Sequence, residues 1–91
     1  MSQTLPESFH LKVITPRQML AEADVQEASL PSLEGLIGVR PGHRPLVVAL
    51  GRGTLTYRQG TSEESFEVRG GCAEILPDQV LVFTESNEEE F

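Results

Sequence analysis

Cysteine, tryptophan and basic residues are scarce in this sequence of 91 residues, and each shortage excludes something. Cys72 is the only cysteine, so no disulfide can form within the chain, which suits a reducing compartment. The net charge of −7 is the opposite of the basic footprint that nucleic-acid binding needs. Tyr57 and the four Phe residues are not interleaved with basic residues, as a base-stacking platform requires. We therefore exclude nucleic acid as a partner.

Long hydrophobic runs are also missing. The longest uninterrupted apolar run, Leu46–Leu50, is far shorter than the roughly 18 residues that a membrane span requires. The amino terminus has neither the basic start and apolar core of a secretory signal nor the Arg- and Ser-rich composition of an import segment. These absences favour a bacterial cytoplasmic protein that forms one domain.

No set of residues in the sequence is typical of catalysis or of cofactor binding. A nucleophile needs an adjacent base, and Cys72 follows two glycines in a predicted strand, where a lone cysteine is usually a small buried hydrophobic residue. His10, His43 and Cys72 are too widely separated for a zinc motif, and His10 falls on the polar face of its strand. No glycine-rich loop precedes a helix, so we expect no phosphate site, metal or cofactor.

Apolar and polar residues alternate in short segments, which is the period of half-buried β-strands. Glycine, proline and polar residues punctuate these segments, and no long helical pattern occurs, so the composition indicates an all-β sandwich or barrel. Residues 18–22 are compatible with a helical turn, but we interpret them as a strand. The polar residues 59–64 predict a hairpin loop. Strands are expected at 9–13, 18–22, 26–30 (ending at Pro31), 46–50, 54–58, 65–69, 72–76 and 79–83.

The stretch from Leu30 to Leu46 is the most informative part of the chain. Gly35 and Gly38 bracket an apolar pair, as in a tight turn that leads into a strand. A loop bounded by Pro41 and Pro45 follows, and proline restricts both its own φ and the residue before it. Such a loop should be stiff and should present its histidine and arginine in one fixed arrangement. We expect Gly38 and Gly42 to be required by backbone geometry.

This stretch resembles the epsilon subunit of the F-type ATP synthase, which is called delta in mitochondria. The family pattern is matched in order by Leu30-Pro31, Glu34-Gly35, Gly38-Val39, Pro41-Gly42-His43 and Pro45-Leu46. Five spaced elements make this a specific match. The sequence departs from the pattern at Ser32, where glycine is frequent, and at Leu36, where some members carry a second acid. The resemblance covers the chain from Phe9 to about Glu85.

The resemblance implies a fold and a function. The family's domain is a flattened β-sandwich of two roughly five-stranded sheets, so we expect an all-β sandwich over residues 1–85. It implies a non-catalytic subunit of the central rotor that couples c-ring rotation to the gamma subunit during proton-driven ATP synthesis. The chain would then be peripheral to the cytoplasmic face of the bacterial inner membrane, through the complex and without membrane insertion.

The same resemblance implies a partner surface. We expect the gamma and c-ring contacts to involve Glu34, Gly35, Leu36, His43 and Arg44, gathered at one end of the sandwich. Because Leu36 replaces an acid, the ring contact should be more apolar than in other members. Two readings of His43 stay open: its side chain either locks the loop from inside or contacts a partner.

Residues 86–91 form an acidic tail, which we interpret as disordered or as a linker. Family members usually continue into a pair of helices that can brake ATP hydrolysis or hold ATP. Because the sequence stops at Phe91, we transfer neither property to it.

The alternative function is a stand-alone ligand-binding or regulatory β-sandwich, which would need a cavity lined by polar groups. Aliphatic residues that should fill the core argue against it: Leu11, Val13, Val48, Leu55, Val80 and Val82. A small hydrolase ranks last, for want of a triad.

Overall fold

The computed structural model describes residues 7–85, so the predicted acidic tail at 86–91 lies outside the described residues. Nine strands occur in this part of the chain, and no helix within it is long and apolar enough to cross a membrane. The strands are β1 (Phe9–Ile14), β2 (Met19–Val25), β3 (Glu27–Ser32), β4 (Gly35–Val39), β5 (Leu46–Ala49), β6 (Arg52–Gln59), β7 (Ser62–Arg69), β8 (Cys72–Leu76) and β9 (Gln79–Phe83).

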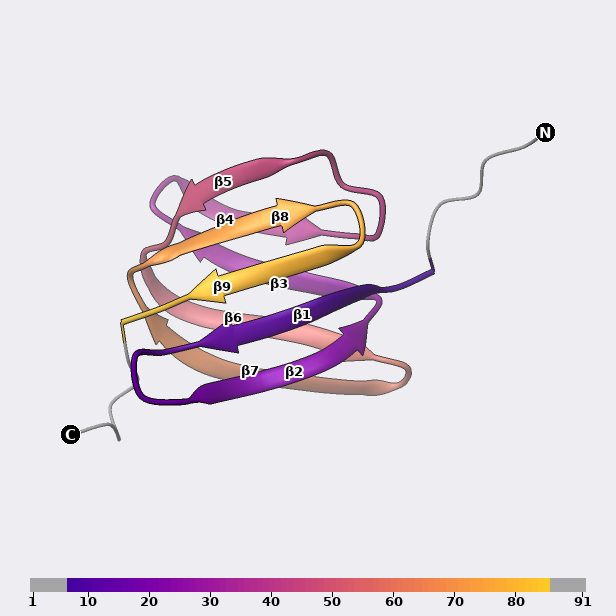
Figure 1. Ribbon diagram of the computed structural model, residues 1–91, viewed down its shortest axis with the longest axis horizontal. Helices are drawn as coiled ribbons and strands as arrows, with labels where there is room; N and C mark the ends of the chain where they lie inside the picture. The colour runs from indigo at the N-terminus through magenta and orange to yellow at the C-terminus, as the bar shows by residue number, and fades with distance from the viewer. Residues whose placement is uncertain (1–6, 86–91) are drawn as a thin grey trace.

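The strands form two sheets that pack face to face as a sandwich (Figure 1). Sheet A has five strands in the order β2-β1-β9-β8-β5, and sheet B has four in the order β4-β3-β6-β7. Most neighbours are antiparallel, but β1 pairs with β9 in parallel, which joins the two ends of the described chain. The predicted all-β sandwich is confirmed, with one sheet a strand smaller than expected.

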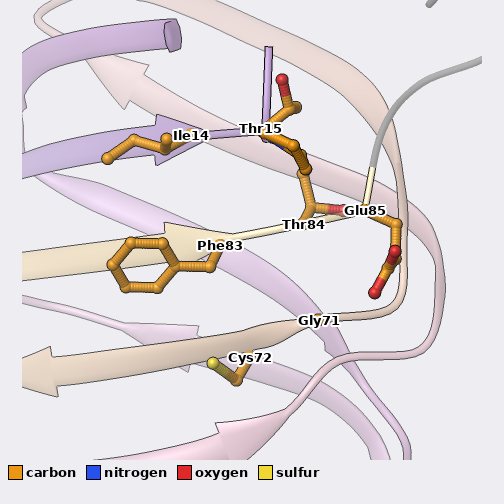
Figure 2. Close-up of a pocket in the computed structure, with 8 residues that line it drawn as sticks. Ile14, Thr15, Gly71, Cys72, Phe83, Thr84 and Glu85 are labelled. Carbon is orange, nitrogen blue, oxygen red and sulfur yellow. The ribbon is translucent and has the colours of Figure 1, made fainter. Parts of the chain in front are cut away.

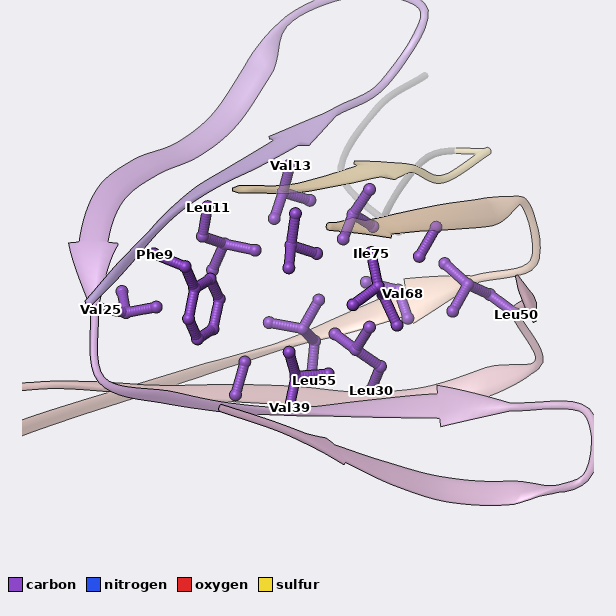
Figure 3. Packing of buried hydrophobic residues seen from close by; sticks show 14 residues of the cluster. Phe9, Leu11, Val13, Val25, Leu30, Val39, Leu50, Leu55, Val68 and Ile75 are labelled. Carbon is purple, nitrogen blue, oxygen red and sulfur yellow. The ribbon is translucent and has the colours of Figure 1, made fainter. Parts of the chain in front are cut away.

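The core consists of side chains that point inward from alternate positions of the strands (Figure 3). In β1 the buried residues are Phe9, Leu11 and Val13, so the alternation seen in the sequence fixes which face of the strand meets sheet B. Five of the residues predicted to face inward are fully buried: Leu11, Val13, Leu55, Val80 and Val82. Val48 is only half-buried, because β5 is the edge strand of sheet A.

Strand boundaries were predicted less well than strand positions. The segment 18–22 is a strand, as interpreted, and it continues to Val25. The strand expected to end at Pro31 runs to Ser32. The hairpin predicted at 59–64 is present, but its loop is shorter than predicted, because Ser62–Glu64 pair with β6 and leave a turn at Gly60-Thr61. These residues are exposed, so no apolar alternation marked them as a strand.

Candidate functional site

The turn between β3 and β4 presents two leucines to solvent. Glu34 donates its backbone N–H to Ser32 Oγ at 3.1 Å, and Ser32 Oγ donates to the Gly35 carbonyl oxygen. Gly35 has a φ of 122°, a conformation that side chains other than glycine rarely adopt. The side chains of Leu33 and Leu36, each 72% exposed, therefore project from a turn with a fixed backbone.

A groove runs from this turn along the edge of the sandwich. Leu33 donates its backbone N–H to the Ala49 carbonyl oxygen at 3.1 Å, which joins the turn to β5. Leu46 and Val47 of β5 are 42% and 68% exposed. The groove has a volume of about 360 Å³ and is lined by Ser32, Leu33, Glu34, Ile37 and Leu46–Ala49. Its walls are largely aliphatic, so it suits an apolar partner better than a charged one.

The loop between β4 and β5 is held by backbone hydrogen bonds. Gly42 has a φ of 86° and donates its N–H to the Pro77 carbonyl oxygen at 2.8 Å, which ties the loop to the β8–β9 turn. The His43 ring donates from Nδ1 to the Arg44 carbonyl oxygen at 2.7 Å. The structure thus shows the contact expected of a loop-locking histidine, whereas Arg44 is exposed.

The predicted contact residues do not form one surface. Glu34, Gly35 and Leu36 lie where β4 begins, and His43 and Arg44 follow the point where β4 ends (Figure 1). The expectation of a single end was therefore wrong, because the intervening residues form an extended strand roughly 15 Å long. The sequence predicted that backbone geometry requires glycine at positions 38 and 42. This prediction is confirmed for Gly42, which has a positive φ, and wrong for Gly38, which lacks one and has open space around its Cβ position.

Cys72 is exposed, which corrects the expectation that it is buried. In β8 the inward positions belong to Ala73 and Ile75, so Cys72 faces the outer surface of sheet A. Figure 2 shows it beside Phe83, its register partner in β9, at a cavity of about 410 Å³. The cavity is lined by Ile14, Thr15, Pro16, Gly71, Cys72, Phe83, Thr84 and Glu85.

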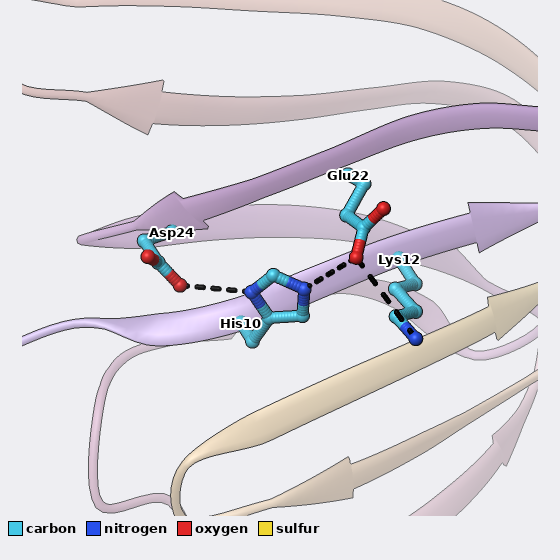
Figure 4. A network of polar contacts seen from close by, with 4 residues as sticks. All are labelled: His10, Lys12, Glu22 and Asp24. Carbon is cyan, nitrogen blue, oxygen red and sulfur yellow. Dashed lines mark hydrogen bonds and ion pairs between the residues drawn. The ribbon is translucent and has the colours of Figure 1, made fainter.

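Sequence reasoning missed a polar cluster on the outer face of sheet A (Figure 4). We call it the His10 cluster: His10 and Lys12 of β1 with Glu22 and Asp24 of β2. His10 Nδ1 lies 2.8 Å from Asp24 Oδ1, and its Nε2 lies 2.9 Å from Glu22 Oε2. The hydrogen bond to Asp24, and then that to Glu22, raise the pKa of His10 above its ordinary value of 6.5. Within residues 7–85 no grouping of His, Cys, Asp and Glu could hold a metal ion.

Taken together, these features define a small β-sandwich domain with an aliphatic core, an apolar exposed turn and a stiff proline-bounded loop. Residues 8–90 match the family model described as ATP synthase, Delta/Epsilon chain, beta-sandwich domain. The chain belongs to this family, which confirms the resemblance drawn from the stretch between Leu30 and Leu46.

Two relatives agree with this assignment. The chain is 40% identical over 84 residues to the ATP synthase epsilon chain of Solibacter usitatus, covering 92% of this chain and 63% of the relative. It is 45% identical over 81 residues to the ATP synthase epsilon chain of Prochlorococcus marinus strain MIT 9515, covering 89% of this chain and 60% of the relative. The chain thus spans about three fifths of the length of these relatives.

Solved structures share the fold. A chain of the Euglena gracilis mitochondrial ATP synthase, seen with OSCP, F1 and the c-ring, superposes with a TM-score of 0.85 at 21% identity. The match covers 94% of this chain and 56% of that one. A chain from the central stalk and c-ring of the Tetrahymena thermophila mitochondrial ATP synthase gives a TM-score of 0.72 at 15% identity, covering 97% and 76%. At these identities the likeness establishes the fold alone.

Proposed function

We propose that this chain is a non-catalytic subunit of the central stalk of an F-type ATP synthase. In this role it couples rotation of the c-ring to the gamma subunit during ATP synthesis. The observation that carries the proposal is the family match over residues 8–90. The chain would be peripheral to the membrane, held at the cytoplasmic face of a bacterial inner membrane through the complex.

Transmitting torque requires a body that does not deform under load. Two sheets packed through fully buried side chains provide such a body, because protein interiors are close-packed and compress little. Further support comes from the way the candidate contacts are held. The β3–β4 turn and the β4–β5 loop are both fixed by hydrogen bonds, so neither must become ordered when a partner binds.

We assign the two ends of β4 to different partners. The turn that carries Glu34, Gly35 and Leu36 would contact the c-ring, and the loop that carries His43 and Arg44 would contact the gamma subunit. Two contacts at opposite ends of one strand suit a subunit placed between a ring and a shaft. The 72% exposure of Leu36 favours an apolar ring contact in place of an ion pair.

Co-purification with the gamma subunit and c-ring of the same organism tests this proposal. We expect the tagged chain to retain both partners. Leu36→Asp should weaken retention of the c-ring at least about tenfold, because it places a carboxylate in an apolar contact. Ser65→Asp is the matched control, since it adds the same charge at an exposed position in the edge strand β7 and should leave retention unchanged.

Either of two results would count against it. Failure of the wild-type chain to retain gamma or the c-ring would contradict the proposed function itself. Equal effects of Leu36→Asp and Ser65→Asp would contradict the assignment of the β3–β4 turn to the ring while leaving the role in the stalk intact.

A further inference from the structure

His10 makes more hydrogen bonds than a neutral histidine can. Its two ring nitrogens lie 2.8 and 2.9 Å from carboxylate oxygens of Asp24 and Glu22 (Figure 4). An ionised carboxylate only accepts hydrogen bonds, so both nitrogens must donate for both contacts to form. Neutral imidazole carries one N–H and imidazolium carries two. The observed geometry is therefore satisfied in full only when His10 is protonated.

The two carboxylates belong to the same strand, and that strand is at the edge of its sheet. Asp24 and Glu22 lie on one face of β2, two positions apart, opposite His10 and Lys12 in the register. In sheet A, β2 pairs with β1 alone. Cross-strand pairs of opposite charge stabilise a sheet, whereas like charges side by side destabilise it. A protonated His10 thus joins β2 to β1 through two hydrogen bonds. Its positive charge also offsets the repulsion between the carboxylates of Asp24 and Glu22.

We propose that the His10 cluster stabilises the pairing of the edge strand β2 with β1, and that this stabilisation depends on pH. Below the pKa of His10 in the folded chain, imidazolium binds Asp24 and Glu22 together. Above it, the neutral ring keeps one donor and leaves the other nitrogen's lone pair facing a carboxylate, so one contact is lost. The strand β2 then separates from β1 more readily, while the rest of the sandwich stays folded. This inference is independent of the proposed function.

The strand β9 lies beside β1 and places no charged side chain at the register positions of His10 and Lys12. On β9, the register partners of His10 and Lys12 are Gln79 and Leu81, which carry no charge. Asp78, in the turn before β9, accepts the backbone N–H of His10 through its carbonyl oxygen at 2.9 Å.

Two more neighbours of β2 are the Lys12 side chain of β1 and the strand β6 of sheet B. Lys12 Nζ lies 3.9 Å from Glu22 Oε2. On β6, which packs against β2 from sheet B, Arg58 pairs with Glu27 and Tyr57 packs against the core.

The sign of the effect follows from the raised pKa of His10. A group that binds its proton more tightly in the folded state stabilises that state fully at pH values below 6.5, its unperturbed pKa. That stabilisation is lost as the pH rises through the higher, folded-state pKa. The pairing of β2 with β1 should therefore be most stable in mild acid and less stable in mild alkali.

Hydrogen exchange of the β2 amides that pair with β1, corrected for intrinsic exchange rates, tests the proposal at about pH 5.5 and pH 8.5, on either side of the histidine range. In the wild-type chain we expect protection of these amides to fall severalfold at the higher pH, while that of β8 and β9 stays constant. His10→Gln should abolish the difference. His43→Gln is the matched control, because it removes the other histidine of the chain and should leave the difference intact.

A second measurement keeps the test decisive if His10→Gln perturbs the fold. NMR titration of the two histidine rings should give a pKa above 6.5 for His10, and Asp24→Asn with Glu22→Gln should lower it. Protection of β2 that is equal at both pH values in the wild-type chain would overturn the proposal. So would a His10 pKa at or below 6.5, or a pH dependence that persists unchanged in His10→Gln.

Discussion

His43 illustrates how a residue can be predicted as important while its role stays open. The sequence placed it between two prolines, which indicated a fixed loop but not the direction of the side chain. The structure shows its ring donating a hydrogen bond to the Arg44 carbonyl oxygen at 2.7 Å, and the residue stays half-exposed. Within residues 7–85 no hydrogen bond to its Nε2 occurs, so this is the ring atom that can meet a partner.

We expect His43→Ala to affect both stability and assembly. Loss of the hydrogen bond to Arg44 should lower the free energy of unfolding by about 1 kcal/mol. Binding to the gamma subunit should weaken as well, because the loop loses the contact that orders it and a ring that could reach the partner. Thermal melting and gamma binding, measured on the same variant, check the two effects. A variant that melts and binds like the wild type would contradict both roles of His43.

Cys72 shows why single residues are harder to place than patterns. A lone cysteine in a strand is usually buried, and that general rule predicted the wrong face. The alternation within β8 gives the right one, because burial of Ala73 and Ile75 requires the residues between and beside them to face outward. Local register was therefore a better guide than residue type.

At the scale of strands and turns, glycines with positive φ mark positions where other residues are poorly tolerated. Gly71, before β8, has a φ of 100°, and a Cβ there would lie 1.8 Å from the Phe83 carbonyl oxygen. Backbone atoms cannot move aside as a flexible side chain can. Only glycine therefore allows the start of β8 to lie this close to the end of β9.

Gly71→Ala should therefore lower the free energy of unfolding strongly, on the order of 3 kcal/mol, through both strain and overlap. Gly38→Ala is the matched control, because Gly38 lies in β4 with open space around its Cβ position and no positive φ. The control should be neutral or stabilising by about 0.5 kcal/mol. Denaturant unfolding of the two variants gives both values, and similar losses in both would refute this account of the glycines.

Hairpins show where periodicity stops being informative. Strands with one buried face, such as β1 and β9, were predicted from alternation because burial selects apolar residues at every second position. The start of β7 carries Ser62, Glu63 and Glu64, which are all exposed. They are strand residues because their backbone pairs with β6, and backbone pairing leaves no mark in the pattern of hydrophobic residues.

At the scale of the whole molecule, the sequence predicted the fold class and most of the core, but not how the candidate contacts are distributed. Sequence proximity suggested that Glu34 and His43 share one end of the sandwich. The strand β4 separates them, because its residues Ile37 and Val39 pack against the core and hold the segment extended. The His10 cluster was missed for the opposite reason, since its partners on β2 become neighbours only through strand pairing.

The central claim is that this sandwich couples the c-ring to the gamma subunit, and proton-driven ATP synthesis tests it most directly. Membrane vesicles that carry the ATP synthase of the same organism would be depleted of this subunit, energised, and assayed with and without the added chain. We expect depletion to abolish synthesis and the added chain to restore it, with Leu36→Asp restoring less than Ser65→Asp. Synthesis that proceeds equally well with and without the chain would contradict the account.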